Sequence, residues 1–295
     1  MFTVVGHLDF SLAEILFRVI PPEGHLPLCP PDEYGPFMVA ASDSQPHAVY
    51  APALVPHTIR TCTDGEIFWD NGVWRTRLND GGKVGIDIFD VQPGQWRPAA
   101  RMAPDFSSGE LLIPDPLPGT TVLRPLYHPQ DRAVVLGRIC HLGGVMMHSS
   151  SVLVDGKVLI FAGMSGAGKT TLARLWRDHG AVILNDERNL IHCHHSGTAI
   201  AGASPWHGEE NQVSSETGPL AGIFFLNQAA ENRLHPLPVP ESLPKMLTCA
   251  FIPVFIPEGP SRTLESCHTI LEGVPAYGMD FTPDARALDL CRSVL

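Results

Sequence analysis

Eight consecutive residues, Gly163-Met164-Ser165-Gly166-Ala167-Gly168-Lys169-Thr170, have the types and the spacing of a phosphate-binding loop. They fit the pattern G-x-x-x-x-G-K-[ST], in which glycines let backbone N–H groups turn toward a triphosphate. The lysine then reaches the outer phosphates, and the hydroxyl residue can ligate Mg²⁺. The sequence therefore predicts a site for ATP with Mg²⁺. The residues expected to bind the nucleotide are Gly163, Ser165, Gly166, Ala167, Gly168, Lys169, Thr170 and Thr171.

A strand and a helix are expected on the two sides of this loop. The apolar run at residues 157–162 is typical of a buried strand. Residues 171–177 have the spacing of an amphipathic helix, and Gly180 is a suitable stop. A strand that leads into such a loop and then into a helix is the context that the motif requires.

His148 is expected beside the same loop. The dipeptide Asp155-Gly156 predicts a two-residue hairpin turn that pairs residue 154 with residue 157. Continued outward, this register places His148 opposite Gly163. A histidine satisfied within the core is the alternative interpretation, and the register favours the site.

Two acids follow the next predicted strand. Residues 181–185 can run parallel to residues 157–162 through a right-handed crossover, which places Asp186 and Glu187 at the carboxyl edge of the sheet. In this hypothesis Lys169 offsets phosphate charge, Thr170 and one acid hold Mg²⁺, and the other acid is the base toward an acceptor hydroxyl. Neighbouring strand residues point to opposite sides, so different roles are expected. Which acid has which role stays open, as does the alternative of a turn with a solvated Glu187.

Three further segments contain residue types that could belong to the site. The segment Ser204-Pro-Trp-His-Gly-Glu209 is either a loop that contacts the ligands through His207 and Glu209 or a structural turn. The run His192-Cys193-His194-His195 places two imidazoles on one face of a strand, an incomplete metal set that favours a surface hairpin. Arg188 could pair with a phosphate or with the neighbouring acids.

Composition limits the classes of partner. The formal charge of -11 gives no basic surface for nucleic acid. Seven cysteines without a C-x-x-C pair suit reduced thiols. No signal peptide is evident, and Pro253 interrupts the longest apolar run. We expect a cytoplasmic protein with no membrane partner, and a homo-oligomer is compatible with the sequence.

The chain is expected to form two domains of an α/β protein. Residues 1–120 alternate in short segments with many prolines, which predicts a β-rich domain. A proline-rich connector at residues 113–119 precedes residues 121–295, where strands and helices alternate around the phosphate-binding loop. This second part is expected to be a P-loop core with a mixed sheet.

Three segments together resemble a known group of proteins. Met147-His148-Ser149-Ser150, the run from Phe161 to Thr171, and Asn185-Asp186-Glu187-Arg188 look like the nucleotide core shared by bacterial HPr kinase/phosphorylase and phosphoenolpyruvate carboxykinase. The resemblance covers residues 140–200 most closely. It implies that His148 lies by the transferred phosphoryl group, that Lys169 and Thr170 bind phosphate and Mg²⁺, and that Asp186 and Glu187 supply metal ligand and base.

The chain also departs from these families. Glu187 stands where the kinases usually carry a second aspartate, and the stretch E-I-R-G-L-G of the HPr kinases is absent. The lysine and arginine set with which the carboxykinases bind oxaloacetate is absent too. The chain therefore resembles the divergent HPr-kinase-related proteins. We expect an ATP-dependent phosphotransferase acting on an unidentified hydroxyl acceptor, which is a protein or peptide, for example through a serine, or a small molecule. The alternatives are an ATP-binding regulatory protein without turnover and a carboxykinase-like lyase.

Overall fold

The computed structural model describes residues 6–40, 44–92, 94–194, 197–208 and 213–295. They form a mixed α/β fold with two mixed β-sheets. The chain divides into two compact units, each described separately below. The first comprises Met1–Ser11, Ile15–His141 and Pro253–Pro260, and the second comprises Leu12–Glu14, Leu142–Ile252 and Ser261–Leu295. Within the described residues, no helix is both long and apolar enough to cross a bilayer.

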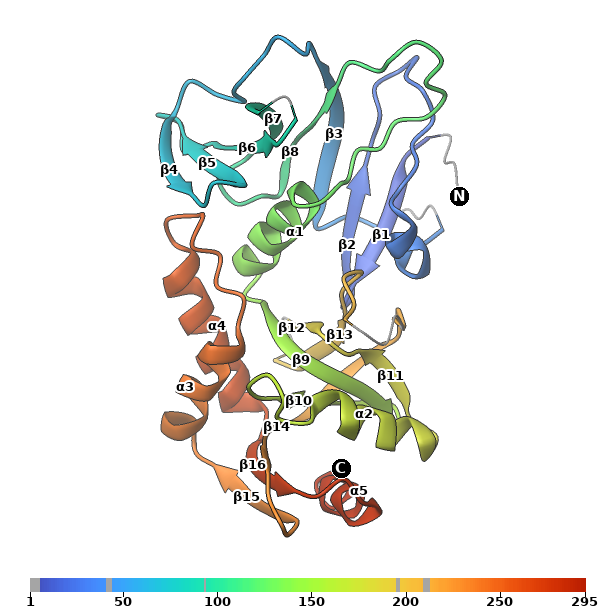
Figure 1. Ribbon diagram of the computed structural model, residues 1–295, viewed down its shortest axis with the longest axis vertical. Helices are drawn as coiled ribbons and strands as arrows, with labels where there is room; N and C mark the ends of the chain where they lie inside the picture. Colours follow the sequence, from blue (N-terminus) through green and yellow to red (C-terminus); the bar gives the residue numbers. More distant parts are fainter. Residues whose placement is uncertain (1–5, 41–43, 93, 195–196, 209–212) are drawn as a thin grey trace. The chain divides into compact units, whose positions relative to one another are not determined.

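The first unit is built on one sheet with the strand order β1-β2-β3-β8-β7-β6-β5-β4 (Figure 1). The pairs β2–β3 and β3–β8 are parallel, and those from β8 to β4 are antiparallel. The elements are β1 (Leu8–Leu12), β2 (Ile15–Val19), η1 (Asp32–Phe37), β3 (Ala48–Val55), β4 (Glu66–Asp70), β5 (Trp74–Leu78), β6 (Val84–Asp90), β7 (Gln95–Met102), β8 (Ser108–Pro114) and α1 (Gln130–His141). Its core includes the stacked rings of Phe10 and Phe17.

The second unit carries the remaining elements on a second sheet. Its strands follow the order β10-β9-β12-β13-β14-β16-β15, with β11 paired to β9 and β10 paired also to β14. The elements are β9 (Val145–Val154), β10 (Lys157–Ala162), α2 (Lys169–Asp178), β11 (Val182–Asn185), β12 (Arg188–Cys193), β13 (Ala199–Ala203), β14 (Thr217–Gln228), β15 (Arg233–Leu237), α3 (Val239–Cys249), α4 (Gly259–Gly273), β16 (Ala276–Phe281) and α5 (Ala285–Arg292).

The hairpin of β9 and β10 has the register that the sequence predicts. Val154 pairs with Lys157, and the ladder continues to Ser149 opposite Ala162. Asp155 and Gly156 both have positive φ, 50° and 73°, as a two-residue type I′ turn requires. The next residue on each strand is therefore His148 on β9 and Gly163 after β10.

The strands around the glycine-rich loop (residues 163–168) are arranged so that several of them end at one edge. β14 lies between β10 and β16 and is parallel to both. β11 is antiparallel to β9, as β10 is, so β11 runs in the same direction as β10 with β9 between them. The predicted parallel direction is confirmed, and the crossover through α2 passes over β9. The carboxyl ends of β10, β11 and β14 therefore share an edge, where ligands of such sheets bind.

An apolar cluster fixes α2 against this sheet. Leu172, Ala173 and Trp176 are fully buried against side chains of β9, β10 and β11 and of α5. The rings of Phe161 and Phe224 lie in the same cluster, tilted by 46° to each other with centroids 5.6 Å apart. The spacing i, i+1, i+4 of the buried residues covers one face of α2. The first turn of the helix is thereby held at the end of β10.

Candidate active site

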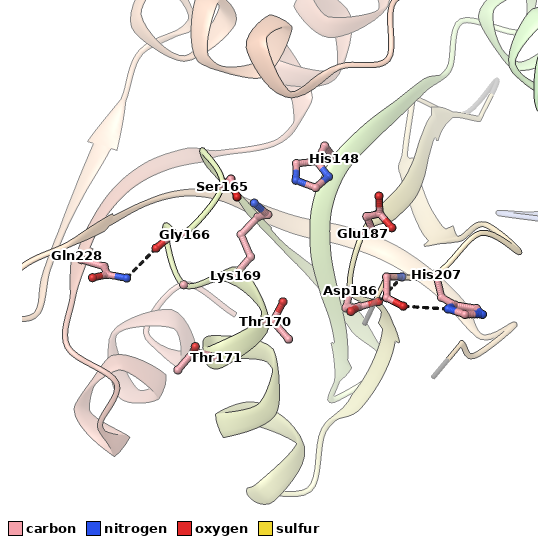
Figure 2. A pocket seen from close by; sticks show the side chains of 12 residues that line it. His148, Ser165, Gly166, Lys169, Thr170, Thr171, Asp186, Glu187, His207 and Gln228 are labelled. Carbon is pink, nitrogen blue, oxygen red and sulfur yellow. Dashed lines mark hydrogen bonds between the residues drawn. The ribbon is translucent and has the colours of Figure 1, made fainter. Parts of the chain in front are cut away.

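One pocket in the second unit gathers residues from three separate segments. Figure 2 shows the glycine-rich loop and α2 on one side, β9 with the residues after β11 on the other, and His207 beside them. The pocket has a volume of about 640 Å³, within the range of small-molecule sites. It is lined by His148, Ser165, Gly166, Gly168, Lys169, Thr170, Thr171, Asp186, Glu187, His207, Gly208 and Gln228.

The backbone at Gly168 turns the loop into α2. Gly168 has φ 98°, in the left-handed region, and it precedes the helix without a side-chain cap. A Cβ atom built on this residue would lie 2.6 Å from the ring of Phe281. Both the conformation and the close packing therefore require glycine. The start of a helix presents N–H groups and a partial positive charge, which suits a phosphate.

Lys169 is folded back on the loop. Its side chain is largely buried, and its Nζ donates hydrogen bonds to the carbonyl oxygens of Gly163, at 2.9 Å, and Met164, at 3.2 Å. Burial lowers the pKa of this ammonium group from its usual value. The Ser150 hydroxyl on β9 donates to the Lys169 carbonyl, at 2.9 Å. The lysine is thus positioned from its backbone and from its side chain.

Gln228 is a site residue that the motif did not reveal. It ends β14, and its Nε2 donates to the Gly166 carbonyl at 2.7 Å (Figure 2). The sequence does contain a signal, because the apolar residues of β14 are typical of a buried strand, and a parallel neighbour of β10 ends at the same edge.

Two residues that the sequence predicts to bind the nucleotide, Gly163 and Ala167, lie in the loop but are not among the residues that line the pocket. Gly163 supplies a carbonyl to Lys169, and Ala167 donates its N–H to the Met164 carbonyl at 3.1 Å. The other predicted residues all line the pocket: Ser165, Gly166, Gly168, Lys169, Thr170 and Thr171.

His148 borders the loop, where the hairpin register put it (Figure 2). It is half-buried, and partial burial is the main cause that lowers its pKa below the ordinary value. The charge of Lys169 acts in the same direction, and Glu187 opposes it. The imidazole is therefore neutral near pH 7 and adds no positive charge to the pocket.

The two acids lie in a tight turn. The Asn185 Oδ1 accepts hydrogen bonds from the N–H groups of Glu187, at 2.7 Å, and Arg188, at 2.9 Å. Because the backbone is bent here and not extended, Asp186 and Glu187 both line the pocket. The expectation that they point to opposite sides is therefore wrong. Arg188 pairs with Glu187, with 2.8 Å between Nη2 and Oε1.

A second segment packs against this turn. Asp186 Oδ1 accepts the N–H of Gly208 at 2.8 Å, and the Asn185 Nδ2 donates to the carbonyls of Ser204, at 2.9 Å, and Trp206, at 3.2 Å. In the segment 204–209, for which the sequence allowed either a ligand contact or a structural turn, His207 and Gly208 line the pocket. Glu209 lies outside the described residues.

The oxygen atoms in the pocket fit a hard divalent cation. Thr170 supplies a hydroxyl, and Asp186 and Glu187 supply carboxylates. Mg²⁺ takes one or two carboxylates and completes its octahedron with water and substrate phosphates. Among the described residues, no three His, Cys, Asp or Glu side chains are grouped to hold a metal ion by themselves. The set therefore fits a cation that is bound together with a nucleotide.

The histidine run on β12 lies apart from this pocket. His192 and His194 have ring centroids 5.1 Å apart, and His194 Nε2 is 2.7 Å from Glu14 Oε2. His195 lies outside the described residues.

The chain has a distant structural likeness to a known kinase/phosphatase. No protein-family model matches the chain, and no curated protein matches it. The solved structure of the Hpr(Ser) kinase/phosphatase from Coxiella burnetii is similar over 50% of this chain and 87% of that one, with 9% sequence identity and a TM-score of 0.30. A likeness of this size carries no argument, so the interpretation of the pocket depends on its own residues.

Proposed function

We propose that this chain is an ATP-binding kinase of the HPr-kinase-related type, which transfers the γ-phosphoryl group to a hydroxyl acceptor. The observation that carries the proposal is that Lys169, Thr170, His148 and Asp186 line one pocket although they come from three segments. A cation, a metal-binding hydroxyl and a carboxylate base are the groups that phosphoryl transfer requires.

The loop side of the pocket binds the phosphates in this proposal. The N–H groups at the start of α2 face the phosphate oxygens, and Lys169 offsets charge on the β and γ phosphates. Thr170 and Glu187, with Asp186 nearby, would hold Mg²⁺. When bound, this cation neutralises charge on the transferring phosphoryl group.

The acid side handles the acceptor. The acceptor oxygen forms a bond to the γ phosphorus while the bond from that phosphorus to the bridging oxygen breaks, and ADP leaves with the bond electrons. Asp186 takes the proton of the acceptor hydroxyl. We assign this role to Asp186 because Glu187 is paired with Arg188. The neutral imidazole of His148 borders the loop as a hydrogen-bonding group.

Single-turnover transfer from ATP labelled in the γ phosphate tests the proposal. The purified chain, in excess over ATP with Mg²⁺, is mixed with a soluble cell extract freed of nucleotides. We expect label on an acceptor, protein or small molecule, that is lost with Asp186→Asn. Gly273→Ala is a matched control, since Gly273 ends α4 with no atom closer than 4.0 Å to an added Cβ.

Two other outcomes would overturn the proposal. Nucleotide binding without consumption in any extract would identify an ATP-binding regulatory protein. Release of carbon dioxide from oxaloacetate that depends on ATP would identify a carboxykinase-like lyase.

A further inference from the structure

The residues 204–208, called the clamp loop here, are held against the acid turn by hydrogen bonds at several points. Asn185 joins the two segments, because its Oδ1 accepts from the turn while its Nδ2 donates to the Ser204 and Trp206 carbonyls. Ser204 adds two hydrogen bonds to the Arg188 carbonyl, from its N–H at 3.1 Å and its hydroxyl at 2.9 Å. Asn185 and Ser204 are fully buried. The clamp loop is therefore fixed before it reaches the pocket.

Gly208 then makes a close approach to the carboxylate of Asp186. Its N–H donates to Asp186 Oδ1 at 2.8 Å. A Cβ built on Gly208 would lie 2.8 Å from Oδ2 and 3.1 Å from both the carboxyl carbon and Oδ1. Asp186 is buried as a residue, and its carboxylate lies between Gly208 and the pocket that it lines. A side chain at position 208 would displace or rotate the carboxylate.

We propose that Gly208 is a positioning residue for Asp186, and that its main-chain N–H, presented by the clamp loop, fixes the rotation of the Asp186 carboxylate in the pocket. This inference rests on the proposed function for the chemistry that Asp186 performs. The physical argument is that a base must lie within hydrogen-bond reach of the proton it takes, and small displacements cost rate. A backbone donor on an anchored loop cannot leave by a change of rotamer. Glycine is needed here for the close approach and not for the backbone conformation, because φ of Gly208 lies outside the left-handed region whereas an added Cβ would lie 2.8 Å from Asp186 Oδ2.

His207 is joined to the same residue. Its Nδ1 lies 3.0 Å from the Gly208 carbonyl oxygen. Because a carbonyl only accepts, the imidazole carries a proton on Nδ1 in this hydrogen bond. Gly208 thus contacts Asp186 through its N–H and His207 through its carbonyl, which couples both pocket residues to one position of the backbone.

Kinetics of Gly208→Ala provide the first test. We expect kcat to fall about tenfold to a hundredfold, the cost of a small misplacement of a catalytic group, while the KM for ATP stays unchanged. Gly273→Ala is the control for a glycine-to-alanine change in the same unit. In the Asp186→Asn background, Gly208→Ala should have almost no further effect, because residues that act as a unit are not additive. Independent, multiplying effects of the two changes would overturn the inference.

A spectroscopic test needs no turnover. His-Gly occurs twice in the sequence, at 179–180 and 207–208, so labelling histidine with ¹³C at the carbonyl and glycine with ¹⁵N selects two amide signals. Gly180 donates to a backbone carbonyl, that of Arg177 at 2.9 Å, and is the internal control. At one fixed pH, we expect the Gly208 amide proton to lie downfield in the wild-type protein, because it donates to a charged carboxylate, and to move upfield in Asp186→Asn while the Gly180 signal stays in place.

The two tests separate the possible failures. A Gly208 amide signal that does not move in Asp186→Asn, or that moves no more than the Gly180 signal, overturns the positioning role even if the wild-type protein is an active kinase. If the wild-type protein transfers no phosphoryl group, the proposed function fails, and the amide signal still decides whether Gly208 holds Asp186. The amide test uses only the wild-type protein and Asp186→Asn, so it does not depend on the folding of Gly208→Ala.

Discussion

The two walls of the pocket are held in place in different ways. The loop wall is held mainly from within residues 163–169, by the left-handed backbone at Gly168 and by hydrogen bonds from the Lys169 ammonium group to loop carbonyls, while Ser150 and Gln228 each add one hydrogen bond from other strands. The acid wall is fixed by buried amide and hydroxyl side chains from β9, β11, β12 and the clamp loop. A local motif therefore specifies most of the first wall, whereas the second depends on segments that meet only in the folded unit.

The side chains of Asn189, Ser149 and Ser151 form a buried hydrogen-bond network behind the acid wall. Asn189 Nδ2 donates to the Ser149 carbonyl, at 2.7 Å, and to the Ser149 hydroxyl, at 3.1 Å, and Asn189 Oδ1 accepts the hydroxyl of Ser151. All three residues are fully buried. Removing one partner from such a network leaves the others unsatisfied in the interior, which costs more than the lost hydrogen bond.

Asp186→Asn is expected to have the largest effect and tests the acid wall at its reacting atom. The change keeps the size of the side chain but removes the basic carboxylate. Loss of a general base lowers kcat by about 10²- to 10⁴-fold, and we expect nucleotide affinity to stay close to normal. Single-turnover transfer and equilibrium nucleotide binding measure the two quantities. Near-normal turnover would show that Asp186 is not the base. The loop wall would then be the wall that carries the proposed chemistry.

Lys169→Ala tests the loop wall and should have the next largest effect. A hydrogen bond to a charged group contributes about 1.5–3 kcal/mol, so we expect nucleotide affinity or transfer to fall roughly tenfold to a hundredfold. The fold should survive. Lys83→Ala removes an exposed lysine of the first unit and is the control. If a folded Lys169→Ala protein kept normal affinity and turnover, the proposed phosphate site would be wrong.

Asn189→Ala and Ser165→Ala compare the two walls in stability. Asn189→Ala should lower the free energy of unfolding by about 1–3 kcal/mol, the cost of buried groups left without partners. Ser165 is an exposed loop residue, and its change to alanine should alter stability by less than about 0.5 kcal/mol. Urea denaturation followed by circular dichroism measures both. Equal effects would contradict the distinction between the walls.

The smallest expected effect is on pH dependence. Burial lowers the pKa of folded His148 below the ordinary 6.5, so the unfolded chain binds the proton more readily. Stability is therefore complete above pH 6.5 and falls as the pH drops from about 6.5 toward the lower folded pKa. The stability is measured as the midpoint of urea denaturation at pH 7.5 and at pH 5.5. His148→Gln should make the decrease in this midpoint between the two pH values smaller. Identical pH profiles for the two proteins would refute it. His192, whose pKa burial also lowers, should give the same sign in His192→Gln.

The hairpin and the acid turn show what the sequence could predict. Asp155-Gly156 fixed a register that puts His148 beside the loop, because a two-residue turn leaves no freedom in the pairing that follows. Residues 181–185 predicted a strand, but not that Asn185 would bend the backbone after it. That bend depends on a buried side-chain hydrogen bond, which propensity and periodicity do not report.

Other parts could not be predicted for the same reason. The sequence does not predict β15, because Arg233-Leu-His-Pro-Leu237 has little apolar alternation and contains a proline. Its pairing with β16 defines it as a strand. The clamp loop was weighed as either a contact or a turn. Only its hydrogen bonds to Asn185 and Asp186, across about twenty residues of chain, bring Gly208 into the pocket.

The folded-back ammonium group of Lys169 has a consequence for the choice of ligand. Two main-chain carbonyls accept hydrogen bonds from this ammonium group, so an anion must compete with them for its charge. A weakly basic monovalent anion gains little from such an exchange, whereas a polyphosphate offers several oxygens and a higher charge at once. Competition experiments should therefore rank triphosphate above sulfate or chloride by more than the difference in their net charges alone.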